Sequence, residues 1–373
     1  MRWQRPDPRS TGRNVPVAVA PNWTFCGVIV VALVVLSLTA GHALAQAPDR
    51  LRLALFHTEL SRQGPGLLLR DIRAEAEDVL RVRDVIAAAR PDVMVLLGFD
   101  YDLDAVALAA FQDLLAAAGH AMPHRHARLP NRGMATGLDM DGDGRTGTPD
   151  DAQGFGRFAG AAGMAVLSRL PIDTAATRDF SAFLWRDLPG ALLPRHQGQP
   201  FPSEQVFDIQ RLATTGFWDV SVLLPDGSPL SLLAWHAGPP AFGGPHQRNL
   251  RRNHDETMFW LHLLDGALPM PPPAPPYVLI GNANLDPAAG DGMHQAIRAL
   301  LDHPALQDPA PASSPPRVPG APATATAHFP QGPGWLRTSY ILPDAGLQVL
   351  DSGLIRAPAP ARHALVWVDI ALP

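Results

Sequence analysis

The sequence predicts a layered α/β domain, and three observations lead to that prediction. Short apolar runs at residues 51–56 and 92–97 have the length of buried strands. A longer stretch with apolar residues at helical spacing follows each run, at residues 67–90 and 104–120. Strand-like segments then recur to the end of the 373-residue chain without an internal repeat. This alternation is typical of helices that pack on a sheet.

The later elements follow from the same patterns. Further strands are expected at residues 164–168, 219–224, 230–235, 277–281, 336–342 and 364–370. Helices are expected at residues 249–264 and 293–301. Charged residues of both signs lie around the start of the helix expected at residues 249–264, including Arg248, Arg252 and Glu256. This pattern is typical of a solvated helix face. The Pro/Ala-rich segment 309–327 predicts a mobile surface loop within one domain spanning residues 46–373.

Composition excludes several classes of protein. With 46% hydrophobic and 17% charged residues the chain can bury a large core, which excludes wholesale disorder. The formal net charge of −5 argues against a general affinity for the nucleic-acid backbone, because such binding needs a basic face. Nucleic acid is therefore not an expected partner.

Residues 1–45 have the pattern of a secretory signal peptide. Four arginines precede a nearly apolar run at residues 25–40, and Ala43-Leu44-Ala45 supplies a small-x-small cleavage site. The run is shorter than the ~20 residues that span a bilayer, although a retained single-span anchor is the alternative. We expect a periplasmic or extracellular protein with no membrane span in its mature form. Cleavage also removes Cys26, the only cysteine, and with it any disulfide or thiol nucleophile.

An Asp-rich segment at residues 139–150 has the spacing of a twelve-residue calcium loop. Its first, third, fifth and twelfth positions are Asp139, Asp141, Asp143 and Asp150. The backbone carbonyl of Arg145 is the expected seventh-position ligand, and Gly144 permits the sharp turn. We expect a structural calcium ion that clamps an insertion at residues 132–160. Asp150 stands where glutamate is usual and follows Pro149, and a solvated Asp/Gly turn without an ion is the alternative.

Several other motifs belong together by order and spacing. They are Phe56-His57-Thr58-Glu59, the strand 163–169, His236 after a strand, Gly281-Asn282-Ala283-Asn284, Leu336 to Tyr340, and Arg362-His363. Together they resemble the endonuclease/exonuclease/phosphatase superfamily, in particular its exported bacterial members with the same Asp-rich loop. The resemblance implies the deoxyribonuclease-I-like fold, a four-layer α/β/β/α sandwich. It also implies a magnesium or manganese site that hydrolyses phosphate esters with a histidine poised by an aspartate.

The site motifs match this family only in part. The matching positions, which the resemblance implies as remnants of a catalytic site, are Glu59, His236, Asn284 and His363. In the other motifs, His57 replaces an asparagine, Gly98 a metal-binding glutamate, and Asn282, Ser339 and Arg362 each an aspartate. One carboxylate among neutral groups and an arginine is a poor magnesium site, since magnesium needs several hard oxygens. Because losing a positioned base alone costs ~10² to 10⁴ in rate, we expect a pseudoenzyme.

Three hypotheses about function follow. The first is an exported pseudoenzyme in which Arg362, His236, His363 and Asn284 bind a phosphate-containing small molecule, unless Arg362 merely pairs with Glu59. The second is an active metal-dependent phosphoesterase with a rebuilt site on Glu59, His57, Asp286 and His363, a set that suits zinc or manganese. The alternative for these two residues is that His57 is a core histidine and that Asp286 caps the following turn. The third is a calcium-stabilised surface protein that serves in adhesion or interaction.

Overall fold

The structure is a computed structural model, and it describes residues 50–313 and 320–372 of the chain. The predicted signal peptide lies outside the described residues, so export stays a prediction. None of the helices in the described part combines the length and the apolar character that a bilayer crossing requires.

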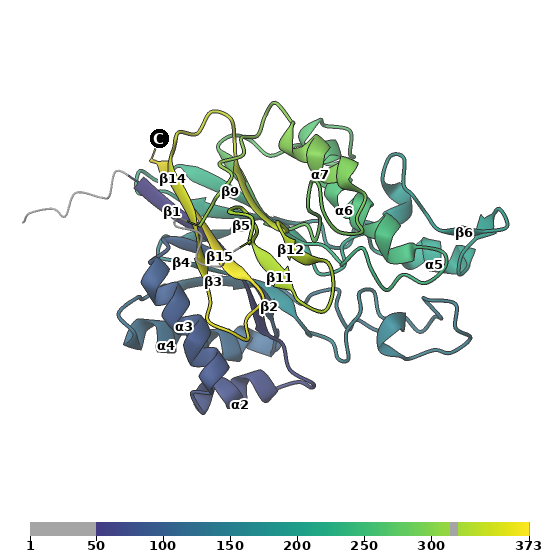
Figure 1. Cartoon of the computed structure of the whole chain (residues 1–373), viewed down its shortest axis with the longest axis horizontal. Coiled ribbons are helices and arrows are strands. Elements are labelled where there is room, and N and C mark those ends of the chain that lie inside the picture. Colours follow the sequence, from purple (N-terminus) through teal and green to yellow (C-terminus); the bar gives the residue numbers. More distant parts are fainter. Residues whose placement is uncertain (1–49, 314–319, 373) are drawn as a thin grey trace, which may run out of the picture. The chain divides into compact units, whose positions relative to one another are not determined.

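Two mixed sheets form the framework of the described chain (Figure 1). In order across the larger sheet, the strands are β14 (Val349–Arg356), β15 (Ala364–Ala371), β1 (Arg50–Leu60), β2 (Val93–Phe99), β4 (Gly163–Ser168) and β3 (His124–Ala127). In order across the smaller sheet, they are β13 (Ser339–Pro343), β10 (Tyr277–Asn282), β9 (Pro229–His236), β8 (Phe217–Leu223) and β5 (Ile172–Asp179).

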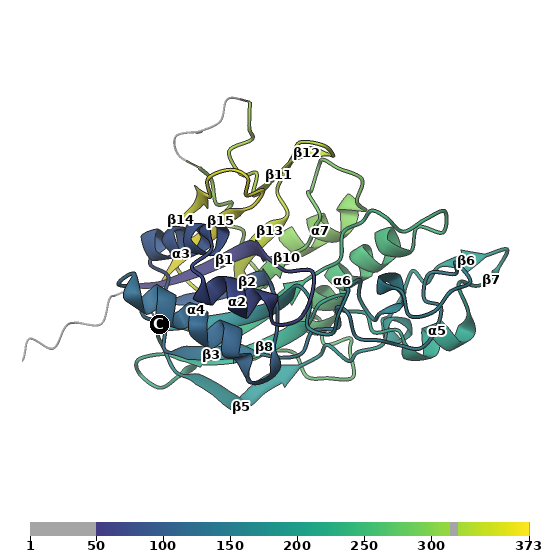
Figure 2. The same cartoon turned by 90° about the horizontal axis from the view of Figure 1, so that it is seen from below.

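The sheets pack face to face between two layers of helices. Side chains such as Leu53 and Val95 of the larger sheet meet Val220 of the smaller sheet in a shared core. The larger sheet is covered outside by α2 (Leu67–Arg73), α3 (Glu77–Ala89) and α4 (Val106–Ala117). The smaller sheet is covered by α6 (Arg248–Leu264) and α7 (His294–Leu301). Figure 1 shows the two groups of helices on opposite sides of the sheets, and in Figure 2, seen from below, α2, α3 and α4 lie in front of the larger sheet. The four-layer arrangement is the one that the resemblance implies.

Short elements connect this framework. They are the strands β6 (Arg195–His196), β7 (Gln199–Pro200), β11 (Ala327–Phe329) and β12 (Gly334–Leu336), the helix α5 (Glu204–Ile209), and the 3₁₀ turns η1 (Leu103–Ala105), η2 (Pro149–Asp151) and η3 (Trp185–Asp187).

Strand register brings distant motifs to one edge of the sandwich. Strands β1 and β2 run parallel, and so do β9 and β10, so the carboxyl ends of each pair lie together. Asn282 at the end of β10 lies opposite His236 of β9 on one side and Ser339 of β13 on the other. Strand β15 runs antiparallel to β1, so the residues that precede it lie near the end of β1.

Three strands that the sequence did not predict lie at sheet edges. Strands β3, β5 and β14 each have only one neighbour, and the side chains of β5 and β14 are mostly half-buried or exposed. An edge strand needs no continuous apolar run, so the apolar pattern that found the central strands was weak there.

Two predicted segments differ from the structure. The helical stretch 67–90 is two helices, because the chain turns between them and Glu75 adopts a left-handed φ of 50°. The predicted loop 309–327 is packed at its ends: Ser313, Ala325 and Thr326 are buried, and the Ser313 amide donates to the Ala323 carbonyl. Residues 314–319 lie outside the described chain.

Candidate functional site

Three histidines from separate motifs form one cluster at the strand ends. The rings of His57 and His363 stack with centroids 4.3 Å apart and an interplanar angle of 20°. The edge of His236 meets the His57 ring with centroids 5.0 Å apart. His236 is only 2% exposed and His363 is also buried. The register therefore brings together the positions that the family motifs single out, with three imidazoles in direct contact.

The His57 ring fills the space that a side chain at position 98 would need. Gly98 has a left-handed φ of 67° and lies at a register irregularity of β2, where an extra residue breaks the pairing with β4. A Cβ at this position would lie 2.8 Å from Cε1 of His57. Thr58 supports the same corner, since its hydroxyl donates to the Leu97 carbonyl at 3.0 Å. With the imidazole in place, a glutamate at position 98 would not fit.

Glu59, the one matching carboxylate, is engaged by Arg362. The Arg362 Nε donates to Glu59 Oε1 at 2.6 Å, and the Arg362 backbone amide donates to Oε2 at 2.8 Å. Both carboxylate oxygens therefore have a donor. The pairing that the sequence left as an alternative is the arrangement in the structure.

The remaining motif positions are occupied by neutral groups. Asn282 is buried, and its Oδ1 accepts from the Asn284 backbone amide at 2.7 Å. The Asn284 side chain donates to the Ala237 carbonyl at 2.8 Å. The backbone amide of buried Ser339 donates to the Thr326 hydroxyl at 3.1 Å. No described carboxylate pairs with His236 or His363 within salt-bridge distance, so neither ring has the anionic partner that the family motifs expect.

Burial keeps all three imidazoles neutral. It lowers the pKa of His57 and that of His236 well below their usual range, and the nearby Arg132 cation lowers the pKa of His236 further. Burial also lowers the pKa of His363 to about 3, and the adjacent Arg362 cation acts in the same direction. An imidazole with so low a pKa is a weak base at neutral pH, because efficient proton transfer needs a pKa near the working pH.

The positions of these residues do not fit a metal ion. Among the described residues, the only three or more His, Cys, Asp or Glu side chains whose ligand atoms converge are Asp139, Asp141 and Asp143. The rebuilt site on Glu59, His57, Asp286 and His363 is therefore not assembled. Asp286 instead caps a turn, since its Oδ1 accepts from the Ala288 and Ala289 amides, each at 2.8 Å. Its Oδ2 accepts from the Arg337 amide at 2.7 Å.

The buried cluster nevertheless has polar atoms without a partner. The Nδ1 atoms of all three histidines and Nδ2 of Asn282 make no hydrogen bond within the described chain. Buried polar groups are nearly always satisfied, so such a group calls for an explanation such as a bound molecule. The cluster is therefore a small polar site, although it is not a carboxylate site.

The Asp-rich segment forms a separate acidic cluster. Oxygens of Asp139, Asp141 and Asp143 lie within 4.8 Å of one another. The two Asp139 oxygens accept from the amides of Gly142 at 2.6 Å and Gly144 at 2.8 Å, and Gly144 has the φ of 84° that such a turn requires. Burial raises the pKa of Asp141, and the Asp143 charge adds to the rise. Convergent acidic oxygens of this kind suit a hard cation.

Asp150, the predicted twelfth ligand, lies outside the group that converges within 4.8 Å, but its charge acts on Asp141 and it lines the same cavity as Asp141 and Asp143, so its role as a ligand stays a prediction. Its neighbour Asp151 is buried and holds the loop together. Asp151 accepts from the Met140 amide at 2.9 Å and from both the amide and the hydroxyl of Thr148 at 2.8 Å. The cap at Thr148 is a signal that the sequence contained, because Thr148 and Asp151 have the spacing of a capping box.

One residue beside the histidine cluster had no sequence signal. The charge of half-buried Arg132 acts on both His57 and His236, and its Nε donates to the Thr215 hydroxyl at 2.9 Å. Arg132 lies before the Asp-rich segment and in none of the motifs, so only the fold brings it to this place.

Comparisons with known proteins identify the family of the chain. The sequence profile of the endonuclease/exonuclease/phosphatase family matches residues 66–367, well over half of the chain. The protein therefore belongs to the endonuclease/exonuclease/phosphatase family, and the predictions of family and fold class are confirmed. No curated protein sequence matches the chain.

Solved structures are similar in fold. An endonuclease/exonuclease/phosphatase from Beutenbergia cavernae matches with a TM-score of 0.52 and 18% identity, over 87% of this chain and 72% of that one. A family protein from Bacteroides thetaiotaomicron matches with a TM-score of 0.48 and 12% identity, over 87% and 98% of the two chains. Sphingomyelinase C from Streptomyces griseocarneus matches with a TM-score of 0.43 and 15% identity, over 86% and 99%. At these identities the likeness concerns the fold alone.

Proposed function

We propose that this member of the family does not hydrolyse phosphate esters and instead binds a phosphate-containing small molecule without a metal ion. The observation that carries the proposal is the His57 ring in the space that a side chain at position 98 would need. A family member that hydrolyses phosphoesters would need a carboxylate there to help hold the cation.

Two further features support the loss of hydrolysis. Arg362 occupies both oxygens of Glu59, so this carboxylate is committed to a guanidinium rather than free for a metal. Among residues 50–313 and 320–372, no carboxylate pairs with His363 or His236, and the low pKa values of both rings make them poor bases for activating water. Hydrolysis therefore lacks both the cation site and the base.

Ligand binding is supported by donors that remain available in the cluster. Arg362 is 54% exposed, and within the described chain no acceptor contacts its two terminal nitrogens. Within the described chain Nδ2 of Asn282 has no acceptor, and each neutral imidazole carries one N–H. Guanidinium and N–H donors together suit the oxygens of a phosphate.

A hydrolysis assay tests the first half of the proposal. The full chain would be incubated with bis(4-nitrophenyl) phosphate and with 4-nitrophenyl phosphate in magnesium, manganese, zinc and calcium. We expect no turnover above that of a His363→Ala variant. Metal-dependent turnover that disappears in this variant would overturn the proposal and favour an active phosphoesterase.

Equilibrium binding of inorganic phosphate tests the second half. In the presence of a chelator, we expect phosphate to bind and Arg362→Ala to weaken binding by about tenfold, since a charged hydrogen bond contributes about 1.5–3 kcal/mol. Absence of phosphate binding would overturn this half of the proposal, and the role of Arg362 would then be only to pair with Glu59.

We also propose that the Asp-rich loop binds calcium and that the chain is exported. Support for calcium comes from the ligand spacing together with the converging oxygens of Asp139, Asp141 and Asp143. Support for export comes from the sequence of residues 1–45. Calcium would have a structural role in an exported protein.

A further inference from the structure

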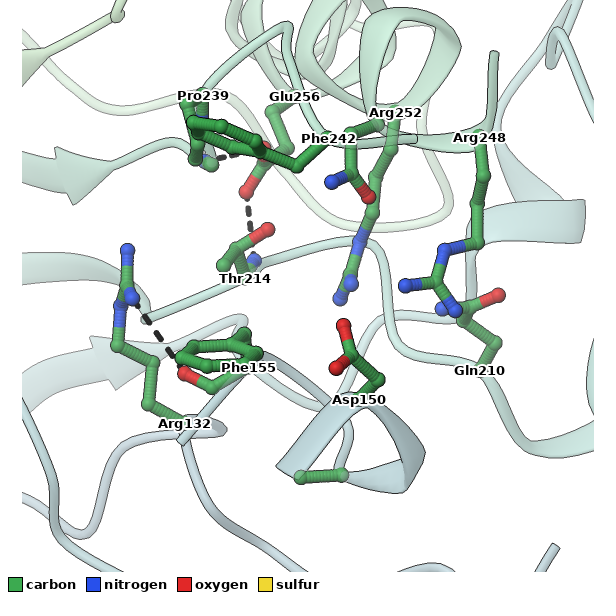
Figure 3. A pocket seen from close by; sticks show the side chains of 13 residues that line it. Arg132, Asp150, Phe155, Gln210, Thr214, Pro239, Phe242, Arg248, Arg252 and Glu256 are labelled. Carbon is green, nitrogen blue, oxygen red and sulfur yellow. Dashed lines mark hydrogen bonds between the residues drawn. The ribbon is translucent and has the colours of Figure 1, made fainter. Parts of the chain in front are cut away.

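A cavity of about 480 Å³ lies beside the histidine cluster and shares no lining residue with it. Its walls come from α6, from the Asp-rich insertion and from the chain after β9 (Figure 3). The volume is within the range of about 300–1,000 Å³ that is typical of small-molecule sites. We call it the arginine pocket, because its charged lining residues are Arg132, Arg248, Arg252, Asp150 and Glu256.

Helix α6 supplies most of these charges from one face. Arg248, Arg252 and Glu256 recur every four residues and are all buried, so the expectation of a solvated face was wrong. Their hydrogen-bond partners in the described chain are backbone groups of the surrounding loops.

Two of the charged groups are mostly engaged within the protein, since only Nη1 of Arg252 has no acceptor among the described residues. The Arg252 guanidinium donates to backbone carbonyls, including that of Leu212 at 2.9 Å and that of Gln153 at 2.7 Å. The Glu256 oxygens accept from the Thr214 amide at 2.6 Å and the Gly238 amide at 2.7 Å. These groups build the floor of the pocket and leave little capacity for a ligand.

The other two arginines have unused donors. Within the described chain, Arg248 donates only to the Met140 carbonyl, and Arg132 donates to the Thr215 hydroxyl and, at 3.5 Å, to the Phe155 carbonyl. Burial lowers the pKa of both residues despite nearby carboxylates, and Arg248 is only 9% exposed. A desolvated cation with unused N–H groups is unfavourable unless an anion meets it.

Polar and aromatic groups complete the site. Gln210 is 2% exposed and lines the pocket, and its Oε1 has no hydrogen-bond partner in the described residues. Phe155 and Phe242 are 51% and 89% exposed, and neither ring stacks on another aromatic ring of the described chain. In Figure 3 the two rings lie at opposite rims of the pocket. Phe242 is held there with a left-handed φ of 65°.

We propose that the arginine pocket binds a small aromatic molecule that carries an oxyanion, either a carboxylate or a phosphate. The oxyanion meets Arg248, whose planar guanidinium group matches two oxygens at once, while Arg132 adds positive charge from the opposite side of the pocket (Figure 3). The ring lies against Phe155 and Phe242, since aromatic rings favour offset or edge contacts. Three arginines against two carboxylates give the pocket a net positive charge. This site is separate from the histidine cluster, so it does not depend on the proposed function.

Calorimetric titration of the full chain with a chelator present tests this site. The probes are benzoate, phenyl phosphate, inorganic phosphate and benzyl alcohol. We expect benzoate or phenyl phosphate to bind at least tenfold more tightly than inorganic phosphate and benzyl alcohol. The stronger of the two aromatic anions identifies the oxyanion. Equal affinity for phenyl phosphate and inorganic phosphate, with no binding of benzoate, would overturn the inference.

Variants assign the binding to the pocket. Arg248→Gln should weaken binding of the aromatic anion by tenfold or more, whereas Arg70→Gln on α2 should leave its affinity unchanged. If Arg362→Ala abolishes binding and Arg248→Gln does not, the pocket is the wrong site, although the proposed phosphate binding stands.

A second variant covers the case in which Arg248→Gln fails to fold. Phe242→Asn changes an exposed side chain, and asparagine tolerates a left-handed φ. This variant should lower the affinity for phenyl phosphate or benzoate by about threefold to tenfold and leave the affinity for inorganic phosphate unchanged. An unchanged affinity for the aromatic anion in this folded variant would contradict the proposal.

Discussion

At the residue scale, the altered positions of the site depend on one another. Gly98 lacks a side chain, and the ring of His57 takes the space that such a side chain would need. In the same way, Arg362 supplies a donor to each oxygen of Glu59. A substitution that restores one residue of the family motif therefore places it beside a side chain that already uses the space or the hydrogen-bonding groups it would need.

Gly98→Ala is expected to destabilise the fold by about 1–3 kcal/mol, through overpacking against His57 and strain at a positive φ. In Gly98→Ala combined with His57→Asn, part of this loss should be recovered, because the smaller side chain leaves room for the methyl group. Urea denaturation of the two single variants and the double variant measures the coupling. Strictly additive losses would show that the two positions do not share this space.

The sequence was sufficient to identify these residues but not their partners. Motif order revealed His57, Gly98, Asn282, Ser339 and Arg362 as substitutions. Which of the two proposed partners Arg362 takes depends on where Glu59 lies across the strand ends, and that distance is a property of the fold. Arg132 and the aromatic rims of the arginine pocket lie outside every motif, so no local pattern could have brought them together.

At the element scale, the proposed calcium site in the Asp-rich loop can be tested through its effect on stability. Calcium should raise the stability of the chain by about 2.7 kcal/mol at a concentration one hundred times its dissociation constant, since it binds the folded state alone. Thermal unfolding with calcium and with a chelator measures the shift. Asp141→Asn should abolish the shift, whereas Asp84→Asn on α3 should retain it. A shift of equal size in Asp141→Asn would place the ion elsewhere.

Central elements were predicted better than peripheral ones for a physical reason. A strand such as β10 is buried along its whole length and reads as an apolar run, whereas the edge strands β5 and β14 need only part of that burial. For helix α6 the element was predicted correctly, but the exposure of its charged residues was not. Its charged residues suggested a solvated face, but carbonyl and amide partners from distant loops allow them to be buried.

At the scale of the whole molecule, buried neutral histidines make stability depend on pH. Burial lowers the pKa of His363 to about 3 and that of His126 to about 4, and it lowers those of His57 and His236 as well. In the unfolded chain each takes up a proton below about pH 6.5. The unfolded state then binds more protons, so stability falls as pH decreases from 6.5 toward the folded pKa.

Each such histidine should contribute a loss of about 1.4 kcal/mol per pH unit in that range. Glu256 acts with the opposite sign, because burial raises its pKa and the folded state holds its proton longer. Urea denaturation at pH 7.5 and pH 5.5 should therefore be compared between the natural chain and His363→Gln, which cannot titrate. The variant should lose less stability, and an identical pH dependence would contradict the burial of a neutral ring.

The two ligand sites are expected to influence each other. Asp150 and Arg248 line the arginine pocket and also a second cavity bounded by Asp141 and Asp143. Calcium would offset the Asp150 charge, so it should raise the affinity for benzoate by about fivefold or more, and benzoate should raise calcium affinity by the same factor. Asp150→Asn should bind benzoate equally well with calcium or chelator. A benzoate affinity in the natural chain that calcium does not change would show that the sites are independent.

The pairing of β1 with β15 has a practical consequence. Arg50 lies directly opposite Ala371. Two residues further along β1, Arg52 lies opposite Asp369, and its Nε donates to Asp369 Oδ1 at 2.7 Å. A short linker could therefore join these two strands and new ends could be opened at the exposed turn around Gly227 between β8 and β9, giving a circular permutant. In such a permutant, reporter domains would be attached at a turn that contributes no lining residue to either cavity.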